Sequence, residues 1–398
     1  MKVEKVEKYD TDISFLFSRK KEKTIFVSDW ENATEELFLN ENVLDDISRD
    51  HSLCNQYIYS RDLFQLKERI CSYINKAGTE KIQKENIMIS STATISGMLV
   101  AKFLKKRNVK KVLILGPIYF TYVHLFYENG IQLFNLQFDL FEEIQLSEEV
   151  FKKIIKDNEI DACLIISPLY RTGVELPTET INMICEVMEY RKRYTIIDEA
   201  YGNFSWNRDK NYLCNIELIN TIIKYSYAIM FDSIAKRVFA NGMKTSIIYS
   251  KDTEIIKEIE KDSVIWVGSL SYIQVNFLNY VFSIGEKEII NIMDRSRDIV
   301  KNNYQYYKQL LKENENMRVV EGNSSYFSLI SIAKDKLKDK TEEKIAIELI
   351  EKYDVMLVPY SRYNYTNEDY LYFSINLLMK REDVEKSLYA INKMISSY

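Results

Sequence analysis

The stretch FDSIAKRVFANGMKTSIIYS, residues 231–250, decides the fold that we predict for this chain. It joins two short apolar runs, YAIMF and TSIIYS, and both runs are typical of buried strands. Between them stand one hydroxyl, Ser233, and two cations, Lys236 and Lys244. A single lysine is usually a solvated surface residue. Lys236 follows a buried strand closely, where open α/β sheets bind their ligands, so we expect partners for it after the other strands.

The middle of the chain alternates between short apolar runs and helical stretches. The predicted strands are IMIS (87–90), VLILG (112–116), ACLIIS (162–167), YTIID (194–198), YAIMF (227–231) and TSIIYS (245–250). Strands that are apolar along their whole length predict a sheet that is buried on both faces and is mostly parallel. The sequence therefore predicts an α/β fold, a large domain with helices on both sides of its sheet.

The sequence pattern also predicts a second, smaller domain. From about residue 285 a long charged helix leads into further strand and helix pairs, which are typical of an α+β domain. We predict a large domain over residues 51–284 and a small C-terminal domain over residues 285–398. We expect residues 1–50 to contribute to the small domain.

Composition limits the functions that need consideration. The 398 residues are 46% apolar and 28% charged, and their net charge of −5 gives no reason to expect nucleic acid or an anionic membrane as a partner. Five cysteines without a CxxC pair fit a reducing compartment, and two histidines give little support to a metal site. The charged start, MKVEKVEKYD, is unlike a signal peptide, so we predict a cytoplasmic protein.

Residues that carry chemistry follow several of the predicted strands. Thr94, Tyr119, Asp198 and Lys236 each come shortly after a different one. Each has a plain alternative: Thr94 and Asp198 are common helix caps, and Tyr119 is a common core residue. Because these strand ends meet at one edge of a parallel sheet, the four together fit a flat, electron-poor ring that carries a phosphate and an aldehyde.

Two segments carry a resemblance to a known family. DEAY (198–201) and SIAK…GMK (233–244) resemble the class I/II aminotransferases, which are fold type I pyridoxal-phosphate enzymes. The resemblance runs from roughly residue 25 to the C-terminus. It implies pyridoxal 5'-phosphate as the cofactor, an amino acid or amine as the substrate, and a homodimer.

The resemblance assigns roles to three residues as the catalytic set. Lys236 would hold the cofactor aldehyde as a Schiff base and later move the α-proton of the substrate. Asp198 would pair with the ring nitrogen and keep it protonated. Tyr201 would donate a hydrogen bond to the phenolate oxygen of the ring.

The resemblance also assigns residues that hold the cofactor. Tyr119 would stack on the ring, and Tyr170 would bond its oxygen. The phosphate would be bound by Ala93, Thr94, Ser233 and Lys244. Tyr57 would reach the phosphate of the neighbouring subunit, although a plain strand aromatic is an equal reading of that position.

The sequence departs from the family pattern at four places. The usual Asn-Pro of an NPTG turn is replaced by Tyr170-Arg171, Lys244 stands where an arginine usually binds phosphate, and Thr92 stands where glycine is common. The fourth departure concerns the substrate. The arginine that binds the substrate carboxylate in the family falls on Ser374 here.

Other residues are therefore candidates for binding the substrate. Arg171 stands beside the predicted cofactor, and Arg362 lies in the tyrosine-rich segment SRYNYTNEDYLYF. Trp30 falls near the segment that usually closes over the substrate. A solvated loop arginine is the plain reading of Arg362.

Three functions remain open on the sequence. Transamination is the commonest outcome in the family. The missing arginine leaves room for a specialised pyridoxal-phosphate reaction, such as decarboxylation, elimination or replacement, cyclisation or oxidation, in natural-product biosynthesis. A protein of another class would keep the fold as a non-catalytic module that binds the cofactor or an effector.

Overall fold

The fold is taken from a computed structural model that describes residues 2–7, 13–29, 41–202, 204–206, 212–338 and 340–398. An eight-stranded sheet has the order β1-β5-β4-β6-β7-β8-β9-β3. Strands β5, β4, β6, β7 and β8 are parallel, and β3 and β8 each pair with β9 in antiparallel fashion. Strand β3 therefore runs in the direction of the parallel strands, and the predicted α/β class with a mostly parallel sheet is confirmed.

The strands of the large sheet are β1 (Lys2–Lys5), β3 (Ile87–Ser90), β4 (Lys111–Leu115), β5 (Gln132–Gln137), β6 (Ala162–Ile166), β7 (Tyr194–Glu199), β8 (Ala228–Asp232) and β9 (Ser246–Ser250). Six of them coincide with the predicted apolar runs. No apolar run predicts β1 and β5, because KVEK and QLFNLQ mix polar and apolar residues.

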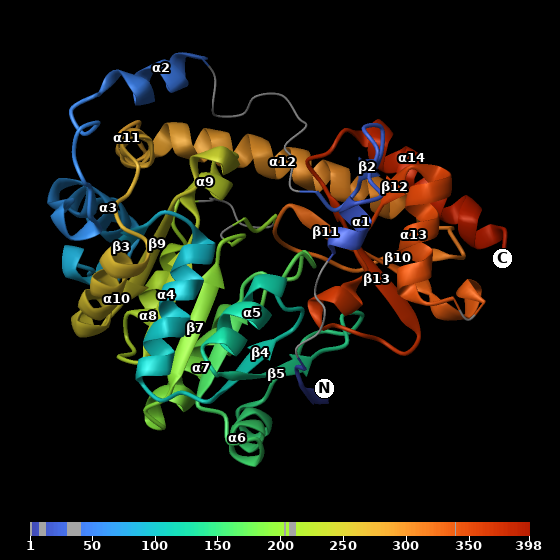
Figure 1. The fold of residues 1–398 in the computed structure, drawn as a ribbon, viewed down its shortest axis with the longest axis horizontal. Helices are drawn as coiled ribbons and strands as arrows, with labels where there is room; N and C mark the ends of the chain where they lie inside the picture. The colour runs from blue at the N-terminus through green and yellow to red at the C-terminus, as the bar shows by residue number, and fades with distance from the viewer. Residues whose placement is uncertain (1, 8–12, 30–40, 203, 207–211, 339) are drawn as a thin grey trace.

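Helices form two layers around this sheet (Figure 1). Helix α4 contacts α5 and α10, and α7 contacts α6 and α8. The helices of the large domain are α3 (Phe64–Ala77), α4 (Ala93–Lys106), α5 (Phe120–Glu128), α6 (Glu148–Asp157), α7 (Thr178–Tyr190), α8 (Ile216–Ile222), α9 (Ile234–Arg237), α10 (Thr253–Trp266) and α11 (Tyr272–Val281). With both faces covered, strands β3, β4, β6, β8 and β9 are apolar and buried almost throughout.

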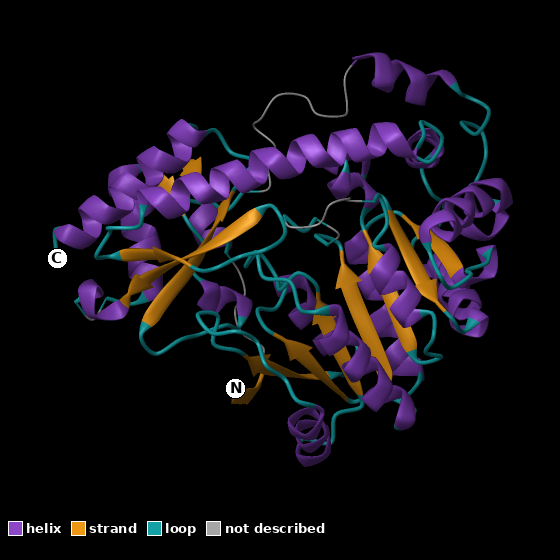
Figure 2. Ribbon diagram, turned by 180° about the vertical axis from the view of Figure 1, so that it is seen from behind, coloured by secondary structure: helices purple, strands orange, loops and turns teal. Residues whose placement is uncertain are grey.

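The long helix α12 (Glu286–Leu310) leads from the large sheet to a smaller unit (Figures 1 and 2). That unit holds a three-stranded antiparallel sheet in the order β10-β11-β13. Its elements are β10 (Met317–Val319), β11 (Phe327–Ala333), α13 (Glu342–Tyr353), β12 (Val355–Met356), β13 (Tyr370–Asn376) and α14 (Arg381–Ser396). The predicted smaller α+β unit is therefore present.

The N-terminal part of the chain contacts both units. Strand β1 pairs with β5 at the edge of the large sheet, whereas β2 (Ile25–Phe26) pairs with β12. The short helices α1 (Ser14–Phe17) and α2 (Glu41–Arg49) complete this part, and α2 packs on α11. The domain boundaries near residues 50 and 285 stay predictions. Within the described residues, no helix is long and apolar enough to cross a membrane.

Candidate active site

Several of the predicted site residues follow strands that end at one edge of the large sheet. Strands β3, β4, β6, β7 and β8 run in one direction, so the loops that follow them lie at the same edge. These loops carry, in chain order, Ala93 and Thr94, Tyr119, Tyr170 and Arg171, Asp198 and Tyr201, and Ser233 and Lys236. Hydrophobic strands thus fix the positions from which these side chains extend.

Lys236 lies against Tyr201. The Lys236 amine is 3.6 Å from the centre of the Tyr201 ring. Burial alone would raise the pKa of the Tyr201 hydroxyl, but the positive charges of Lys236 and Arg171 outweigh burial and lower the pKa below its usual value of 10.0. The two residues follow different strands, Tyr201 after β7 and Lys236 after β8, and their contact gives this edge a phenol with unusual acidity.

Asp198, the residue before the last one of strand β7, is a buried carboxylate that is only 6% exposed. The hydroxyl of Tyr122 donates a short hydrogen bond to it, and the backbone N–H of Ala200 donates another at 2.9 Å. Burial raises the pKa of Asp198, while Tyr122, Ala200 and the charge of Lys236 act in the opposite direction. A buried carboxylate that is held in this way is suited to meet a cationic partner.

The opposite end of the site is formed by the start of helix α4. The hydroxyls of Thr94 and Tyr119 are 3.4 Å apart, and Tyr119 packs edge-on against Tyr122. The first N–H groups of a helix have no carbonyl partner within the helix, so the amides of Ala93 and Thr94 can bind an anion. Ser233 is 5% exposed and occupies the N-cap position of helix α9, where its side chain makes no capping hydrogen bond.

Lys244 lies in the loop that precedes strand β9. Its backbone is left-handed (φ +48°), and the amide of Gln274 donates to the carbonyls of both Lys244 (2.5 Å) and Ser91 (3.0 Å). Gln274 thereby ties the loop of Lys244 to the loop that leads into α4.

Arg171 lies in a tight turn among aromatic residues. Its guanidinium group is 4.7 Å from the ring centre of Phe327 and donates to the carbonyl of Ser28 at 2.6 Å. The turn needs Gly173, because a Cβ at this residue would lie 2.5 Å from the carbonyl oxygen of Phe327, at a φ of +79°. Tyr170, which precedes Arg171, packs edge-on against Tyr363.

The sequence matches the family described as aminotransferase class I and II over residues 28–391. The chain belongs to this family. Members of the family use pyridoxal phosphate, so the protein is a pyridoxal-phosphate-dependent, aminotransferase-like enzyme, and the predicted resemblance is confirmed. Comparison with curated protein sequences gives no match.

Solved structures of aminotransferases share the fold of this family member. An aromatic aminotransferase from Pyrococcus horikoshii OT3 has a TM-score of 0.79 and 17% identity, with 97% of this chain and 99% of that chain covered. An aspartate aminotransferase from Thermotoga maritima has a TM-score of 0.77 and 16% identity, with 98% and 97% covered. A double mutant of Thermus thermophilus aspartate aminotransferase has a TM-score of 0.78 and 14% identity, with 93% and 91% covered. At these identities the likeness establishes the fold.

The residues of this aminotransferase-family chain fit pyridoxal phosphate. An amine (Lys236) and a buried carboxylate (Asp198) lie on one side, and free helix amides with hydroxyls lie at the start of α4. The carboxylate suits a protonated ring nitrogen, and the helix start suits a phosphate.

Three further positions that the sequence singled out are an exposed tyrosine, a buried serine and a tryptophan that is not described. Tyr57 is 83% exposed, although the backbone of its neighbour Ile58 pairs with Leu270. Ser374, the position at which the resemblance predicts the family arginine, is fully buried in β13. Trp30 lies outside the described residues.

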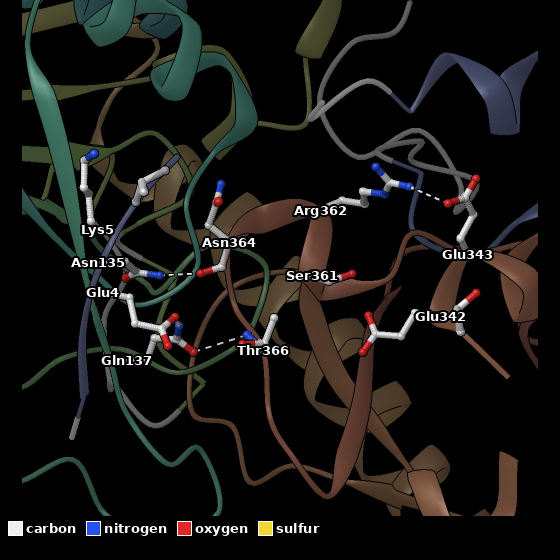
Figure 3. A pocket seen from close by; sticks show the side chains of 12 residues that line it. Glu4, Lys5, Asn135, Gln137, Glu342, Glu343, Ser361, Arg362, Asn364 and Thr366 are labelled. Atoms are coloured by element: carbon white, nitrogen blue, oxygen red, sulfur yellow. Dashed lines mark hydrogen bonds and ion pairs between the residues drawn. The ribbon is translucent and has the colours of Figure 1, made fainter. Parts of the chain in front are cut away.

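Arg362 lines a separate cavity of about 400 Å³ between strand β5 and the turn 360–363 (Figure 3). Its guanidinium group is 3.3 Å from the carboxylate of Glu343 and packs over Phe15 at 5.0 Å. The charge of Arg362 is therefore already met by a carboxylate.

Sequence reasoning missed several residues of the site. Tyr122 orients Asp198, and Tyr363 and Phe327 line the surroundings of Arg171. Tyr122 comes three residues after Tyr119 and so lies on the same side of the first turn of α5, which is a usable signal. Tyr363 lies in the tyrosine-rich segment SRYNYTNEDYLYF, which marks the region but not this residue. Phe327 belongs to a distant segment that the fold brings here, and no local pattern marks it.

Proposed function

We propose that this enzyme acts at the α-carbon of an amino acid or related amine, with Lys236 as the residue that holds the cofactor covalently. The observation that carries the proposal is the arrangement of Lys236, Tyr201 and Asp198 at adjacent strand ends. The amine lies 3.6 Å from the Tyr201 ring centre, and its charge acts on the buried Asp198 carboxylate. An amine, an acidic phenol and a carboxylate are the groups that pyridoxal-phosphate chemistry needs from a protein.

Bound pyridoxal phosphate supplies an electron-poor ring that accepts the electron pair of a bond broken at the substrate α-carbon. Asp198 keeps the ring nitrogen protonated, and Tyr122 keeps Asp198 in place. Tyr201 donates a hydrogen bond to the ring oxygen. With cofactor and substrate bound, Lys236 Nζ would act as the general base that accepts the α-proton of the substrate and as the general acid that donates this proton back.

The remaining predicted residues hold the cofactor in this proposal. Tyr119 stacks on the ring, and the turn at Tyr170 closes one side of it. The start of α4 binds the phosphate through Ala93 and Thr94, with Ser233 and Lys244 beside it. Lysine at position 244 supplies charge without the two-pronged geometry of arginine.

Transamination is the reaction that we propose first. The second candidate is a specialised pyridoxal-phosphate reaction in a biosynthetic pathway: decarboxylation, elimination or replacement, cyclisation or oxidation. Two observations favour it, the buried Ser374 at the position of the family arginine and the Tyr170-Arg171 turn in place of Asn-Pro.

We also propose a homodimer in the cytoplasm. Tyr57 is 83% exposed beside the buried residue Ile58, so its ring is available to a second subunit. The cysteines of the chain are all free, which suits a reducing compartment.

The experiment treats the purified protein with pyridoxal phosphate, records its visible absorbance, reduces it with borohydride and locates the modified peptide by mass spectrometry. Modification at Lys236 is expected. Lys236→Ala should lose the absorbance band, while Lys251→Ala, at an exposed lysine, should keep it. A band that persists in Lys236→Ala would refute the assignment, and a wild-type protein without a reducible band would favour a non-catalytic module.

The reaction is identified by a screen of amino acids with product analysis. A transaminase should form a keto acid from its amino donor. A decarboxylase or lyase should release its product without any keto acid acceptor.

A further inference from the structure

We propose that Arg171 binds the carboxylate of the substrate and so replaces the arginine that is absent at Ser374. This inference rests on the proposed function, and it assigns the substrate class to α-amino acids with a free carboxylate rather than to simple amines.

Arg171 differs from two other arginines, Arg237 and Arg362, in having no carboxylate partner among the described residues. Arg237 is paired with two carboxylates, and Arg362 is paired with Glu343. Among the described residues, no carboxylate pairs with Arg171. Its guanidinium group contacts the carbonyl of Ser28 and the faces of Tyr170 (5.7 Å) and Phe327 (4.7 Å).

The surroundings of Arg171 carry a free-energy cost. The Nε–H of Arg171 is buried and has no hydrogen-bond partner among the described residues. A buried donor without a partner is unfavourable, and a buried charge without a counter-ion is more so. The Tyr363 hydroxyl, which is hydrogen-bonded to Arg171, two aromatic faces and one carbonyl compensate for part of this cost. A carboxylate that arrives with a ligand would supply the rest.

Arg171 and Lys236 both act on the same tyrosine. Tyr201 interacts with both: its ring contacts the Lys236 amine, and the charges of Lys236 and Arg171 both lower the pKa of its hydroxyl. Tyr170, next to Arg171 in the chain, packs 6.1 Å from the Tyr201 ring. In an α-amino acid the amine and the carboxylate are separated by a single carbon. A substrate whose amine reaches Lys236 can therefore direct its carboxylate toward Arg171.

Arg171 is also linked to Ser374, the position of the missing arginine. The carbonyl of Ser28 accepts from Arg171, and the hydroxyl of Ser28 donates at 2.5 Å to the carbonyl of Ser374. Ser28 thus links the two positions. Arg171, in the loop after β6, is therefore connected to strand β13 through a single residue.

The turn that carries Arg171 is built to hold it there. The carbonyl of Gly173 accepts from the backbone N–H groups of Asn323 (2.8 Å) and Ser324 (3.0 Å), and the Thr172 hydroxyl donates to Leu169 (2.8 Å). Such a rigid turn preorganises the guanidinium group for a planar, two-oxygen ligand.

The test uses the protein loaded with pyridoxal phosphate and measures binding by calorimetry. The probes are 3-phenylpropanoate, which has a carboxylate and no amine, and phenethylamine, which has an amine and no carboxylate. Arg171→Met should weaken binding of the carboxylate roughly 10- to 100-fold, the range for losing a charged hydrogen bond. Binding of the amine should stay within about threefold. Arg171→Lys, which keeps the charge, should fall between wild type and Arg171→Met.

The control is Arg318→Met. Arg318 packs over Phe141 at 4.7 Å, the same distance as Arg171 from Phe327, but it lies on β10 away from Lys236. It should leave the binding of both probes unchanged.

Three results would overturn the proposal: unchanged carboxylate binding in Arg171→Met, an equal loss for both probes, or a loss in Arg362→Met in place of Arg171→Met. Should Arg171→Met fail to fold, Arg171→Lys gives the same comparison. Absence of a borohydride-reducible lysine in wild type would instead refute the proposed function, so the two failures are distinguishable.

Discussion

Arg237 and Glu199 form an ion pair in which neither side chain has any exposed surface. Each follows a residue of the site directly, because Glu199 comes after Asp198 and Arg237 after Lys236. Arg237 also pairs with Asp232 at 3.2 Å and donates to the carbonyl of Leu213 at 2.7 Å. This buried pair therefore links the segment that carries Lys236 to the segment that carries Asp198.

Replacing Arg237 with Met should destabilise the fold by about 3–5 kcal/mol, because it leaves Glu199 and Asp232 buried without a counter-ion. Urea unfolding measures this change. Arg107→Met is the matched control, since Arg107 pairs with Glu258 near the surface (43% and 26% exposed) and should cost at most about 1 kcal/mol. Equal losses in the two variants would contradict the prediction.

The loss in Arg237→Met should also depend on pH. Burial raises the pKa of Glu199 to about 7 even beside Arg237, and removing the arginine should raise it further. A carboxyl group whose folded pKa lies above its unfolded value contributes stability at low pH and loses it as the pH rises through the folded pKa. The variant should therefore be less stable at about pH 8 than at about pH 6. A loss that does not change with pH would contradict this account.

Tyr122→Phe should change the pH dependence of cofactor binding. The Tyr122 hydroxyl helps to keep the pKa of Asp198 down, against the effect of burial. Without it the pKa of Asp198 rises, so the carboxylate becomes protonated at a higher pH. Affinity for pyridoxal phosphate should fall roughly tenfold, and its loss on acidification should begin at a higher pH than in wild type.

The control for this variant is Tyr249→Phe. The Tyr249 hydroxyl also donates to a buried carboxylate, that of Asp232 at 2.8 Å, but outside the site. The Tyr249→Phe variant should be less stable than wild type, but the pH dependence of its binding of pyridoxal phosphate should be unchanged. A shift in Tyr249→Phe as large as that in Tyr122→Phe would mean that stability alone causes the effect.

The order of the strand-end residues could be predicted from the sequence. Apolar runs identify β3, β4, β6, β7, β8 and β9, and the geometry of a parallel sheet then brings Asp198 and Lys236 to one edge. The contacts that complete the site could not be predicted in this way. Arg171 bonds Ser28, which lies 143 residues away, and such pairings follow from how the two sheets pack.

The same limit applies to residues that act from the core. The sequence marks Arg237 only as a charged residue after Lys236, with no sign that it is fully buried. Its partner Glu199 stands in DEAY beside Asp198. Alternation along β7 sends these two neighbours to opposite faces, so one faces the site and the other the core.

The cysteines give a prediction about reactivity. Cys54 is exposed, whereas Cys71, Cys163, Cys185 and Cys214 are buried. Burial raises the pKa of Cys71 and of Cys185 to about 12, so these thiols rarely ionise. The native protein should react quickly with a thiol reagent at Cys54 and slowly at the other four. Cys54→Ser should abolish the fast phase, and a second fast thiol would contradict the described burial.

Replacing Gly97 on α4 with alanine should lower stability, although alanine usually stabilises a helix relative to glycine. Alanine within a helix is normally more stable than glycine by about 1 kcal/mol, but a Cβ at Gly97 would lie 2.7 Å from Cε1 of Tyr122. Tyr122 is fully enclosed between α4 and Asp198, so it cannot move aside freely. Gly97→Ala should therefore destabilise the fold by about 1–3 kcal/mol and displace the hydroxyl from Asp198. Gly242→Ala, where a Cβ meets nothing within 4 Å, should cost little. A stabilised Gly97→Ala protein that still binds pyridoxal phosphate normally would show that Tyr122 does not need its described position.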